Sequence, residues 1–317
     1  MSFSTDIKNE VTHLDSPKEE LISELSAIVR NSANIDKDIT IYIENNSVAR
    51  RIFKLFKTIY EITPVITVRR KLFNKGLSYI LTIKNKLNLI LSDLSIVKDN
   101  IYQDIPHDYI IADTDLIRAY LRGLFLVTGS VNDPKTSKYH LEFLVDTDTY
   151  ADFICNLLDT FNLNSKVLKR KKKYMIYIKE AEKISDFLRI IKSFNGVMYY
   201  EDIRIYRDHK NMTNRLNNCE QANMDKIFLT AADQIKNIKK IKEHDMYDLM
   251  DDKIKIVMDY RLKYPEASLT ELSEIISRET NEELSKSGLN HRFRKIREIA
   301  NNIDTLENNW LIYIIML

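Results

Sequence analysis

The sequence is poor in glycine, proline and cysteine, and each shortage excludes a class of protein. Only five glycines and five prolines occur in 317 residues, so the chain is neither collagen-like nor a low-complexity linker. The two cysteines, Cys155 and Cys219, form no metal-binding spacing and no disulfide framework, which indicates a reducing compartment. The six histidines also lack ligand spacing, and no Ser/His/Asp or phosphate-loop pattern occurs. We therefore expect no metal ion and no cofactor.

A dominant charge and a long apolar run are missing as well. The net charge of +2 gives no chain-wide attraction to nucleic acid, so DNA binding would depend on local patches. The start, MSFSTDIKNEV, lacks the apolar run of a signal peptide. The apolar tail over residues 304–317 is too short for a membrane span of roughly 20 residues. We expect a cytoplasmic protein without membrane contact, whose tail packs on the core or on a partner.

Periodic patterns predict two similar halves in residues 1–205. Apolar spacing typical of helices and alternation typical of strands follow the order helix, strand, helix, paired strands, helix. The first copy comprises residues 19–30, 39–45, 47–62, two β-rich runs around a turn at Asn74 to Gly76, and 86–97. The second copy comprises residues 115–129, 138–147, 148–161, 164–180 and 181–194. This repeat, over about 15–100 and 110–200, predicts one duplicated α+β domain.

The last third of the chain is predicted to be helical. We expect a helical linker over residues 206–249, as one or two long helices, and a small helix-turn-helix module over 250–303. Residues 208–223 are dense in asparagine, which helices tolerate but do not favour. This favours a buried polar network that joins the domains, with Cys219 as a small buried residue; nucleotide or DNA binding is the alternative. The network would contain Asn211, Asn214, Arg215, Asn217, Asn218 and Asn223.

Charge separates the two main helices of the predicted C-terminal module. Ser268 and Glu271 have the spacing of a capping box at the start of the first helix. Residues 266–283 hold six acids and one base, whereas residues 285–297 hold five bases and no acid. A DNA duplex repels the first segment and attracts the second. The sequence thus predicts DNA contacts from Ser285, Lys286, Ser287, Asn290, His291, Arg292, Arg294, Lys295 and Arg297, with Asn290 and Arg294 one turn apart for base contacts.

Two basic hairpin tips in the duplicated domain are weaker candidates. The segments VRRK at 68–71 and KRKKK at 169–173 lie beside predicted strand turns. The simplest interpretation is a solvated surface, and the alternative is auxiliary contact with DNA phosphates. The residues concerned are Arg69, Arg70, Lys169, Arg170, Lys171 and Lys172.

The segment LRGLFLVTGSVNDP at 121–134 predicts a helix that ends in a glycine turn, and LSAIVRNSA at 25–33 is its counterpart. Both resemble the LAGLIDADG motif of homing endonucleases, whose eighth position is an acid that binds metal ions. Ser32 and Thr128 occupy that position here, and a hydroxyl is a poor substitute for a carboxylate. The resemblance implies a degenerate motif kept for helix packing, without catalysis. The alternative is a metal-dependent nuclease that uses Asp36 and Asp133 as relocated acids.

Four segments in one order resemble the WhiA family of bacterial transcription regulators: the N-terminal MSFS, residues 118–134, 214–223 and 265–300. The resemblance covers nearly the whole chain apart from the apolar tail. It implies a degenerate LAGLIDADG-like domain followed by a helix-turn-helix domain, and a non-catalytic regulator of transcription. It also implies binding to double-stranded promoter DNA on the nucleoid, and roles in cell division and chromosome segregation. Another transcription factor or RNA polymerase is an expected partner, and a ligand-sensing or protein-sensing N-terminal domain is a third hypothesis.

Overall fold

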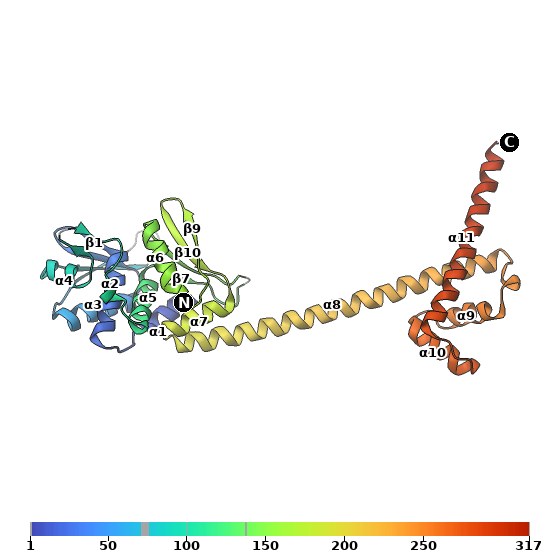
Figure 1. Ribbon diagram of the computed structural model, residues 1–317, viewed down its shortest axis with the longest axis horizontal. Coiled ribbons are helices and arrows are strands. Elements are labelled where there is room, and N and C mark those ends of the chain that lie inside the picture. The colour runs from blue at the N-terminus through green and yellow to red at the C-terminus, as the bar shows by residue number, and fades with distance from the viewer. Residues whose placement is uncertain (1, 71–75, 100, 137, 317) are drawn as a thin grey trace. The chain divides into compact units, whose positions relative to one another are not determined.

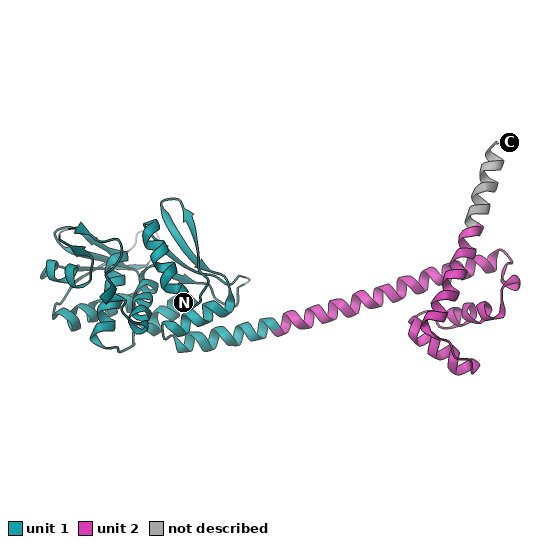
Figure 2. Ribbon diagram, viewed as in Figure 1, with its two compact units in different colours: residues 1–208 teal, residues 209–317 magenta. Residues whose placement is uncertain are grey.

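The structure is a computed structural model that describes residues 2–70, 76–99, 101–136 and 138–316, with side chains as far as residue 303. The chain divides into two compact units, residues 1–208 and residues 209–317 (Figure 2). Helix α8 (Phe194–Glu243) contributes residues to both units. Each unit has its own hydrophobic core.

The N-terminal unit contains two copies of one topology. Helix α1 (Phe3–Val11) precedes the first copy, which consists of α2 (Lys18–Ser32), β1 (Ala33–Ile35), β2 (Ile39–Ile43), α3 (Asn46–Tyr60), β3 (Val65–Arg70), β4 (Leu77–Ile83) and α4 (Leu87–Asp93). A short pair, β5 (Val97–Lys98) and β6 (Ile101–Tyr102), and the 3₁₀ turn η1 (Asp108–Ile110) follow. The second copy consists of α5 (Thr114–Thr128), β7 (Gly129–Val131), β8 (Leu141–Val145), α6 (Asp148–Asp159), β9 (Lys166–Arg170), β10 (Lys173–Ile178) and α7 (Ala181–Ile190).

The two antiparallel sheets show the duplication directly. Their strand orders are β1-β2-β4-β3 and β7-β8-β10-β9, which are the same order in the two copies. Each sheet begins with a short strand that continues directly from a helix, β1 from α2 and β7 from α5. The predicted α+β duplication is therefore confirmed. The predicted helix at 86–97 is shorter than expected, because α4 ends at Asp93, and the turn residues 71–75 lie outside the described residues.

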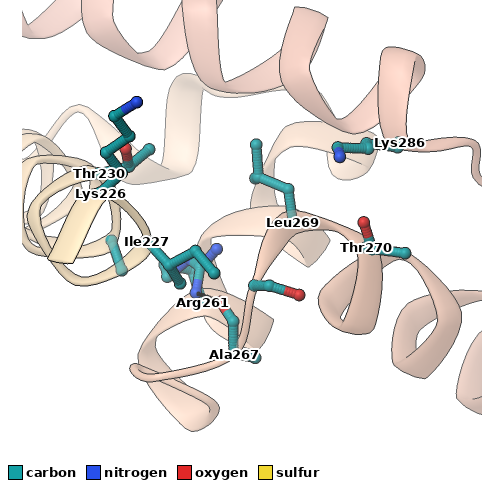
Figure 3. Close-up of a pocket in the computed structure, with 10 residues that line it drawn as sticks. Lys226, Ile227, Thr230, Arg261, Ala267, Leu269, Thr270 and Lys286 are labelled. Carbon is teal, nitrogen blue, oxygen red and sulfur yellow. Dashed lines mark hydrogen bonds between the residues drawn. The ribbon is translucent and has the colours of Figure 1, made fainter. Parts of the chain in front are cut away.

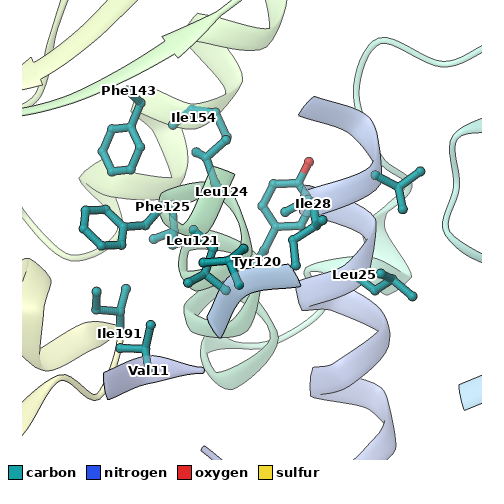
Figure 4. Packing of buried hydrophobic residues seen from close by; sticks show 14 of the residues in the cluster. Val11, Leu25, Ile28, Tyr120, Leu121, Leu124, Phe125, Phe143, Ile154 and Ile191 are labelled. Atoms are coloured by element: carbon teal, nitrogen blue, oxygen red, sulfur yellow. The ribbon is translucent and has the colours of Figure 1, made fainter. Parts of the chain in front are cut away.

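Helices α2 and α5 pack side by side between the two sheets (Figure 1). Ile28 of α2 points toward a cluster that includes Leu121, Leu124 and Phe125 of α5, whereas Leu25 lies on the opposite side of α2 (Figure 4), and all five are fully buried. Removing such side chains from water stabilises a fold by about 1.5–3 kcal/mol each. The helices that carry the degenerate motif therefore form the centre of the hydrophobic core.

Gly123 permits the close approach of these helices. A Cβ atom at this position would lie 2.2 Å from the carbonyl oxygen of Glu24 and 3.1 Å from the Cβ of Ala27. Because the first contact is with backbone, a side chain here would force the helices apart. Glycine is therefore required at this point for space.

The glycine turn predicted at the end of α5 is wrong. Gly129 has φ −78° and ψ 148°, which is extended backbone, and it opens strand β7. A Cβ atom there would lie 2.3 Å from Cδ2 of Phe125, so the glycine avoids a steric clash with this ring. The helix passes directly into a strand, as α2 does at Ala33.

The C-terminal unit is all-helical. After α8 it contains the 3₁₀ turn η2 (Tyr247–Leu249), α9 (Asp252–Lys263), α10 (Leu269–Thr280) and α11 (Lys286–Met316). Its core joins Ile238 and Ile241 of α8 to residues of the other three helices, such as Met258, Leu272 and Phe293. The linker expected over residues 206–249 differs from the structure here, because the end of α8 is part of this core. The side chains of the apolar tail lie outside the described residues.

The buried polar network predicted within residues 208–223 is wrong. All these residues, including Asn214, Asn218 and Cys219, are exposed on α8. Asparagine density signalled polarity here but not burial. Among the described residues, no helix is both long and apolar enough to cross a membrane.

Candidate nucleic-acid interface

Helix α10 begins at the capping box that the sequence predicts. The backbone N–H of Glu271 donates to Oγ of Ser268 at 3.2 Å, and the N–H of Ser268 donates to Oε2 of Glu271 at 2.8 Å. The hydrogen bond that the Glu271 carboxylate accepts from the backbone N–H of Ser268 lowers the pKa of Glu271. The helix ends at Asn281, which adopts the left-handed conformation with φ 53°, and the chain turns toward α11.

The turn between α10 and α11 is held by two serine hydroxyls. Oγ of Ser277 accepts the N–H of Leu284 at 2.9 Å, which ties the turn back to α10. Oγ of Ser285 accepts the N–H of Gly288 at 3.1 Å and thereby caps α11. The N–H groups of Lys286 and Ser287 lie in the first turn, where a helix supplies no acceptor. The start of α11 can therefore bind an anion, although the Ser285 hydroxyl already has an internal role.

Helix α11 has one buried and one exposed face. Leu289, Phe293 and Ile296 are buried against α9 and α10, as their spacing predicts. Eight of the nine predicted DNA-contact residues are exposed, all except Arg292: Ser285, Lys286, Ser287, Asn290, His291, Arg294, Lys295 and Arg297. Asn290 and Arg294 lie one turn apart, about 40° around the axis, so they share one side of this exposed face.

Two predicted DNA-contact residues have partners in neighbouring helices. Nη1 of Arg292 donates to the carbonyl oxygen of Lys253 at 3.3 Å, and its side chain is half-buried. Nη2 of Arg297 lies 3.6 Å from Oδ2 of Asp233, with both side chains more than half exposed. Arg292 therefore braces α11 against α9, whereas the exposed Arg297 pair contributes little to stability.

Part of the negative charge of helix α10 is paired with residues at the end of α9. Nζ of Lys263 lies 3.0 Å from Oε2 of Glu279, and the Tyr264 hydroxyl donates to Oε1 at 3.0 Å. The Lys263 hydrogen bond, followed by that of Tyr264, lowers the pKa of Glu279. Glu274 and Glu266 are exposed. The two helices thus present opposite charges.

The two basic tips lie at the ends of hairpin strands, as predicted. β9 and β10 pair with Arg170 opposite Lys173, and Lys171 adopts the left-handed conformation in the tight turn between them. Lys169, Arg170, Lys171 and Lys172 are exposed. Arg69 and Arg70 are exposed at the end of β3, and Lys71 lies outside the described residues. The structure places these cations on two separate sheets.

Both degenerate motif positions direct their hydroxyls into their own helices. Oγ of Ser32 donates to the carbonyl oxygen of Ile28 at 2.6 Å, and Oγ1 of Thr128 donates to that of Leu124 at 3.0 Å. Such bonds to the carbonyl four residues earlier are typical of serine and threonine near a helix end. The corresponding positions of the two copies therefore have the same local role.

Asp133 and Asp36, the acids of the alternative nuclease hypothesis, lie in the β7–β8 and β1–β2 connections. Oδ1 of Asp133 accepts the backbone N–H of Lys135 at 2.9 Å and the Tyr199 hydroxyl at 3.3 Å. Asp36 is exposed in the turn between β1 and β2. Within the described part of the chain, no three His, Cys, Asp or Glu side chains are grouped to hold a metal ion.

Comparison with known proteins places three family domains along the chain. Residues 18–97 match the WhiA N-terminal LAGLIDADG-like domain, residues 117–210 the WhiA LAGLIDADG-like domain, and residues 213–300 the WhiA C-terminal HTH domain. Proteins called "Probable cell division protein WhiA" from Staphylococcus aureus strains JH9 and Newman are 39% identical over 310 residues. The match covers 96% of this chain and 98% of each relative. The chain belongs to the WhiA family.

Two solved WhiA structures share the fold. Full-length DUF199/WhiA from Thermotoga maritima is 24% identical with a TM-score of 0.57, and the match covers 95% of this chain and 99% of that one. The N-terminal LAGLIDADG domain of DUF199/WhiA is also 24% identical, with a TM-score of 0.51 over 60% of this chain and 90% of that one. The predicted family and architecture, a duplicated LAGLIDADG-like domain with a helix-turn-helix domain, are confirmed.

A buried ion network at the α2–α5 seam of this WhiA-family chain was not predicted. Glu24 is fully buried and accepts from Nε and Nη2 of Arg51 at 2.8 and 2.9 Å, and from Nε of Arg122 at 2.9 Å. Arg122 occupies the second position of the degenerate motif and is also fully buried. The sequence signal for this network was the presence of an arginine and a glutamate on otherwise apolar helix faces. The charges of Glu24, Arg51 and Arg122 at this seam are therefore paired with one another inside the protein.

Proposed function

We propose that this WhiA-family chain is a sequence-specific DNA-binding regulator of transcription that acts without catalysis. The observation that carries the proposal is the exposed cationic face of α11 beside the acidic α10. Such an arrangement admits a duplex to one helix only, because phosphate charge is attracted to α11 and repelled by α10. The WhiA C-terminal HTH match over residues 213–300 supports the same assignment.

In this proposal α11 enters the major groove with its N-terminal turns. Lys286 and the first N–H groups of α11 bind backbone phosphates and set the position of the helix. Asn290 and Arg294, on one exposed side, contact base edges: an amide pairs well with adenine, and a guanidinium with guanine. His291 and Lys295 flank them. Sequence preference thus comes from two side chains, and general affinity from the others.

The duplicated domain acts as a non-catalytic scaffold in this proposal. Its two motif helices end in hydroxyls that bond to their own backbone, and their seam holds the buried Glu24 network. The exposed tips around Arg70 and Lys171 supply auxiliary, sequence-independent phosphate contacts. A scaffold of this kind positions the protein along DNA without hydrolysing it.

The cellular role that we propose is control of genes for cell division and chromosome segregation. The name of the Staphylococcus aureus relatives, "Probable cell division protein WhiA", supports the first part. The protein would act in the cytoplasm on nucleoid DNA at promoters, together with RNA polymerase or another transcription factor. Chromatin immunoprecipitation with sequencing in the native host would test this role, and the absence of enrichment at promoters would contradict it.

Binding to DNA would be tested with the double variant Asn290→Ala, Arg294→Ala. We expect at least a tenfold loss of preference for the sequence enriched from randomised duplexes over a scrambled duplex, since a good bidentate base contact contributes about 1–3 kcal/mol. Fluorescence anisotropy at fixed salt measures both affinities. Lys286→Ala should weaken both duplexes equally and reduce the salt slope by about one.

The matched control is Arg278→Ala, which removes an exposed arginine from the acidic helix α10. Because that face repels a duplex, its loss should leave both affinities unchanged. Unaltered selectivity in the Asn290, Arg294 double variant would remove α11 as the reading helix.

A further inference from the structure

A cleft of about 320 Å³ opens within the C-terminal unit (Figure 3). Its walls come from residues 226–231 of α8, from Arg261 near the end of α9, from the N-terminus of α10 and from the first residue of α11. Three cationic side chains line it: Lys226, Arg261 and Lys286. None of the lining residues in the described chain is an aspartate or glutamate. The cleft therefore has a positive lining without an internal counter-charge.

Arg261 is the unusual member of this lining. Its side chain is only 1% exposed, and its Nη1 donates to the carbonyl oxygens of Ala267 at 2.6 Å and Tyr264 at 3.3 Å. Its Nε is buried without a hydrogen-bond partner, and in the described chain no carboxylate pairs with the guanidinium. Burial lowers the pKa of Arg261, because the charged form loses solvation. A buried arginine without an acid is costly unless another anion compensates it.

The free edge of this guanidinium matches a phosphate group. In the described residues, neither Nε nor Nη2 of Arg261 makes a hydrogen bond. These two nitrogens form a fork that can donate to two oxygens of one phosphate. Lys226 and Lys286 are exposed at the same cleft and can approach the remaining oxygens. Three cations suit a doubly charged anion better than a single carboxylate.

The start of α10 adds backbone donors to the same cleft. Leu269 and Thr270 line it and are the first two residues of this 12-residue helix, where N–H groups lack intrahelical acceptors. The capping box occupies the N–H groups of Ser268 and Glu271 instead. The Glu271 carboxylate is thereby committed to Ser268 and is not among the lining residues. Cationic side chains and the first residues of a helix thus line the same cleft.

We propose that this cleft is a phosphate-binding site, with Arg261 as its buried bidentate donor and Lys226 and Lys286 as flanking cations. The phosphate has two possible carriers, a small phosphorylated molecule or the DNA backbone beside α11. Only the second carrier rests on the proposed DNA-binding function. With a small molecule, occupancy would couple α8 to the first turn of the DNA-reading helix.

The test uses full-length protein and pyrophosphate as the probe, with chloride adjusted to constant ionic strength, in isothermal titration calorimetry. We expect saturable 1:1 binding that weakens about tenfold or more in Lys226→Gln, Lys286→Gln, since each change removes a charged hydrogen-bond donor from the cleft. The control Lys239→Gln, Lys253→Gln, at two exposed lysines outside the cleft, should bind like wild type. Arg261→Lys, which keeps the charge but loses the fork, should also bind more weakly.

Absence of saturable binding by the wild type, or equal affinity in the cleft variant, would overturn the proposal. Both lysines are exposed, so their replacement tests the site even if Arg261→Lys does not fold. The single variant Lys226→Gln, at the cleft lysine that lies outside the proposed DNA contacts of α11, distinguishes the carriers: it weakens both DNA and pyrophosphate if the backbone is the carrier, and pyrophosphate alone if a small molecule is. Pyrophosphate binding alongside unaltered selectivity in Asn290→Ala, Arg294→Ala would refute only the DNA-reading function.

Discussion

Arginine is buried in both units, but only the N-terminal unit supplies carboxylates for it. Arg51 and Arg122 converge on Glu24, with Glu20 a further 3.7 Å from Nη2 of Arg122. Arg261 of the C-terminal unit has two carbonyl oxygens and the Phe293 ring, 5.5 Å from its guanidinium carbon, but no acid among the described residues. Nη1 of Arg122 also lacks a partner, so the difference lies in charge compensation.

This difference separates a structural charge from one that is available to a ligand. At the α2–α5 seam, the buried Glu24 carboxylate pairs with both Arg51 and Arg122 within the protein. In the C-terminal unit, the cations of α11 and of the cleft face outward or lack an internal acid. The contrast supports the proposal that recognition depends mainly on the second unit, while the buried network of the first unit has a structural role.

The largest expected effect is in Glu24→Gln. The change leaves Arg51 and Arg122 buried without their shared carboxylate, and breaking a buried pair in this way costs about 3–5 kcal/mol. Urea unfolding of the full-length chain, followed by hydrogen exchange in α2 and α5, measures the loss. Glu19→Gln, at an exposed acid on the same helix, is the control. Equal stability of the two variants would mean that the network does not hold the seam.

Alanine substitutions at one glycine in each unit test the comparison between the two units. The expected change in stability is of intermediate size. Gly123→Ala should cost about 1–3 kcal/mol, because its Cβ would meet backbone of α2 at 2.2 Å and force the helices apart. Gly288→Ala in α11 meets only the Leu284 and Ser285 side chains, at 3.3 and 3.4 Å. It should be neutral or stabilise by up to about 1 kcal/mol, since alanine favours helices. Thermal unfolding of both variants measures this, and similar losses would contradict the difference between the two glycines.

Sequence patterns predicted where the helices and strands of this fold lie along the chain. They predicted less well which of their residues are buried and what those residues contact. Periodicity located α2, α5 and α11, because a helix with one buried face repeats its apolar residues regularly. It could not show that Gly129 is extended, since that depends on the Phe125 ring beside it. The buried network predicted within residues 208–223 was wrong for a related reason, because polarity does not reveal whether another element covers a helix.

The candidate interface was partly predictable for the same reason. The charge of α11 is a local property, so most of its predicted contact residues are exposed. The Arg292 bond to Lys253 and the isolation of Arg261 depend on distant segments that pack against them. A base on the apolar face of α9, next to Val257 and Met258, was the only available signal for Arg261. A single sequence does not tell whether such a base has found an acid.

The smallest expected effect concerns an exposed pair, Lys263 and Glu279, which contrasts with buried Glu24. The Lys263 hydrogen bond lowers the pKa of Glu279 below 4.5, so its stabilisation is complete above that pH and is lost as pH falls through the folded-state pKa. The bond to Glu279 also raises the pKa of Lys263 above 10.5, so that contribution is lost as pH rises through the raised value. Glu279→Gln should therefore loosen α9 and α10 slightly at pH 7, and the effect should shrink as pH falls through the folded-state pKa of Glu279; hydrogen exchange of full-length protein measures this. High salt should shrink the difference, because exposed pairs are screened; a loss as large as that of Glu24→Gln would contradict the distinction between buried and exposed acids.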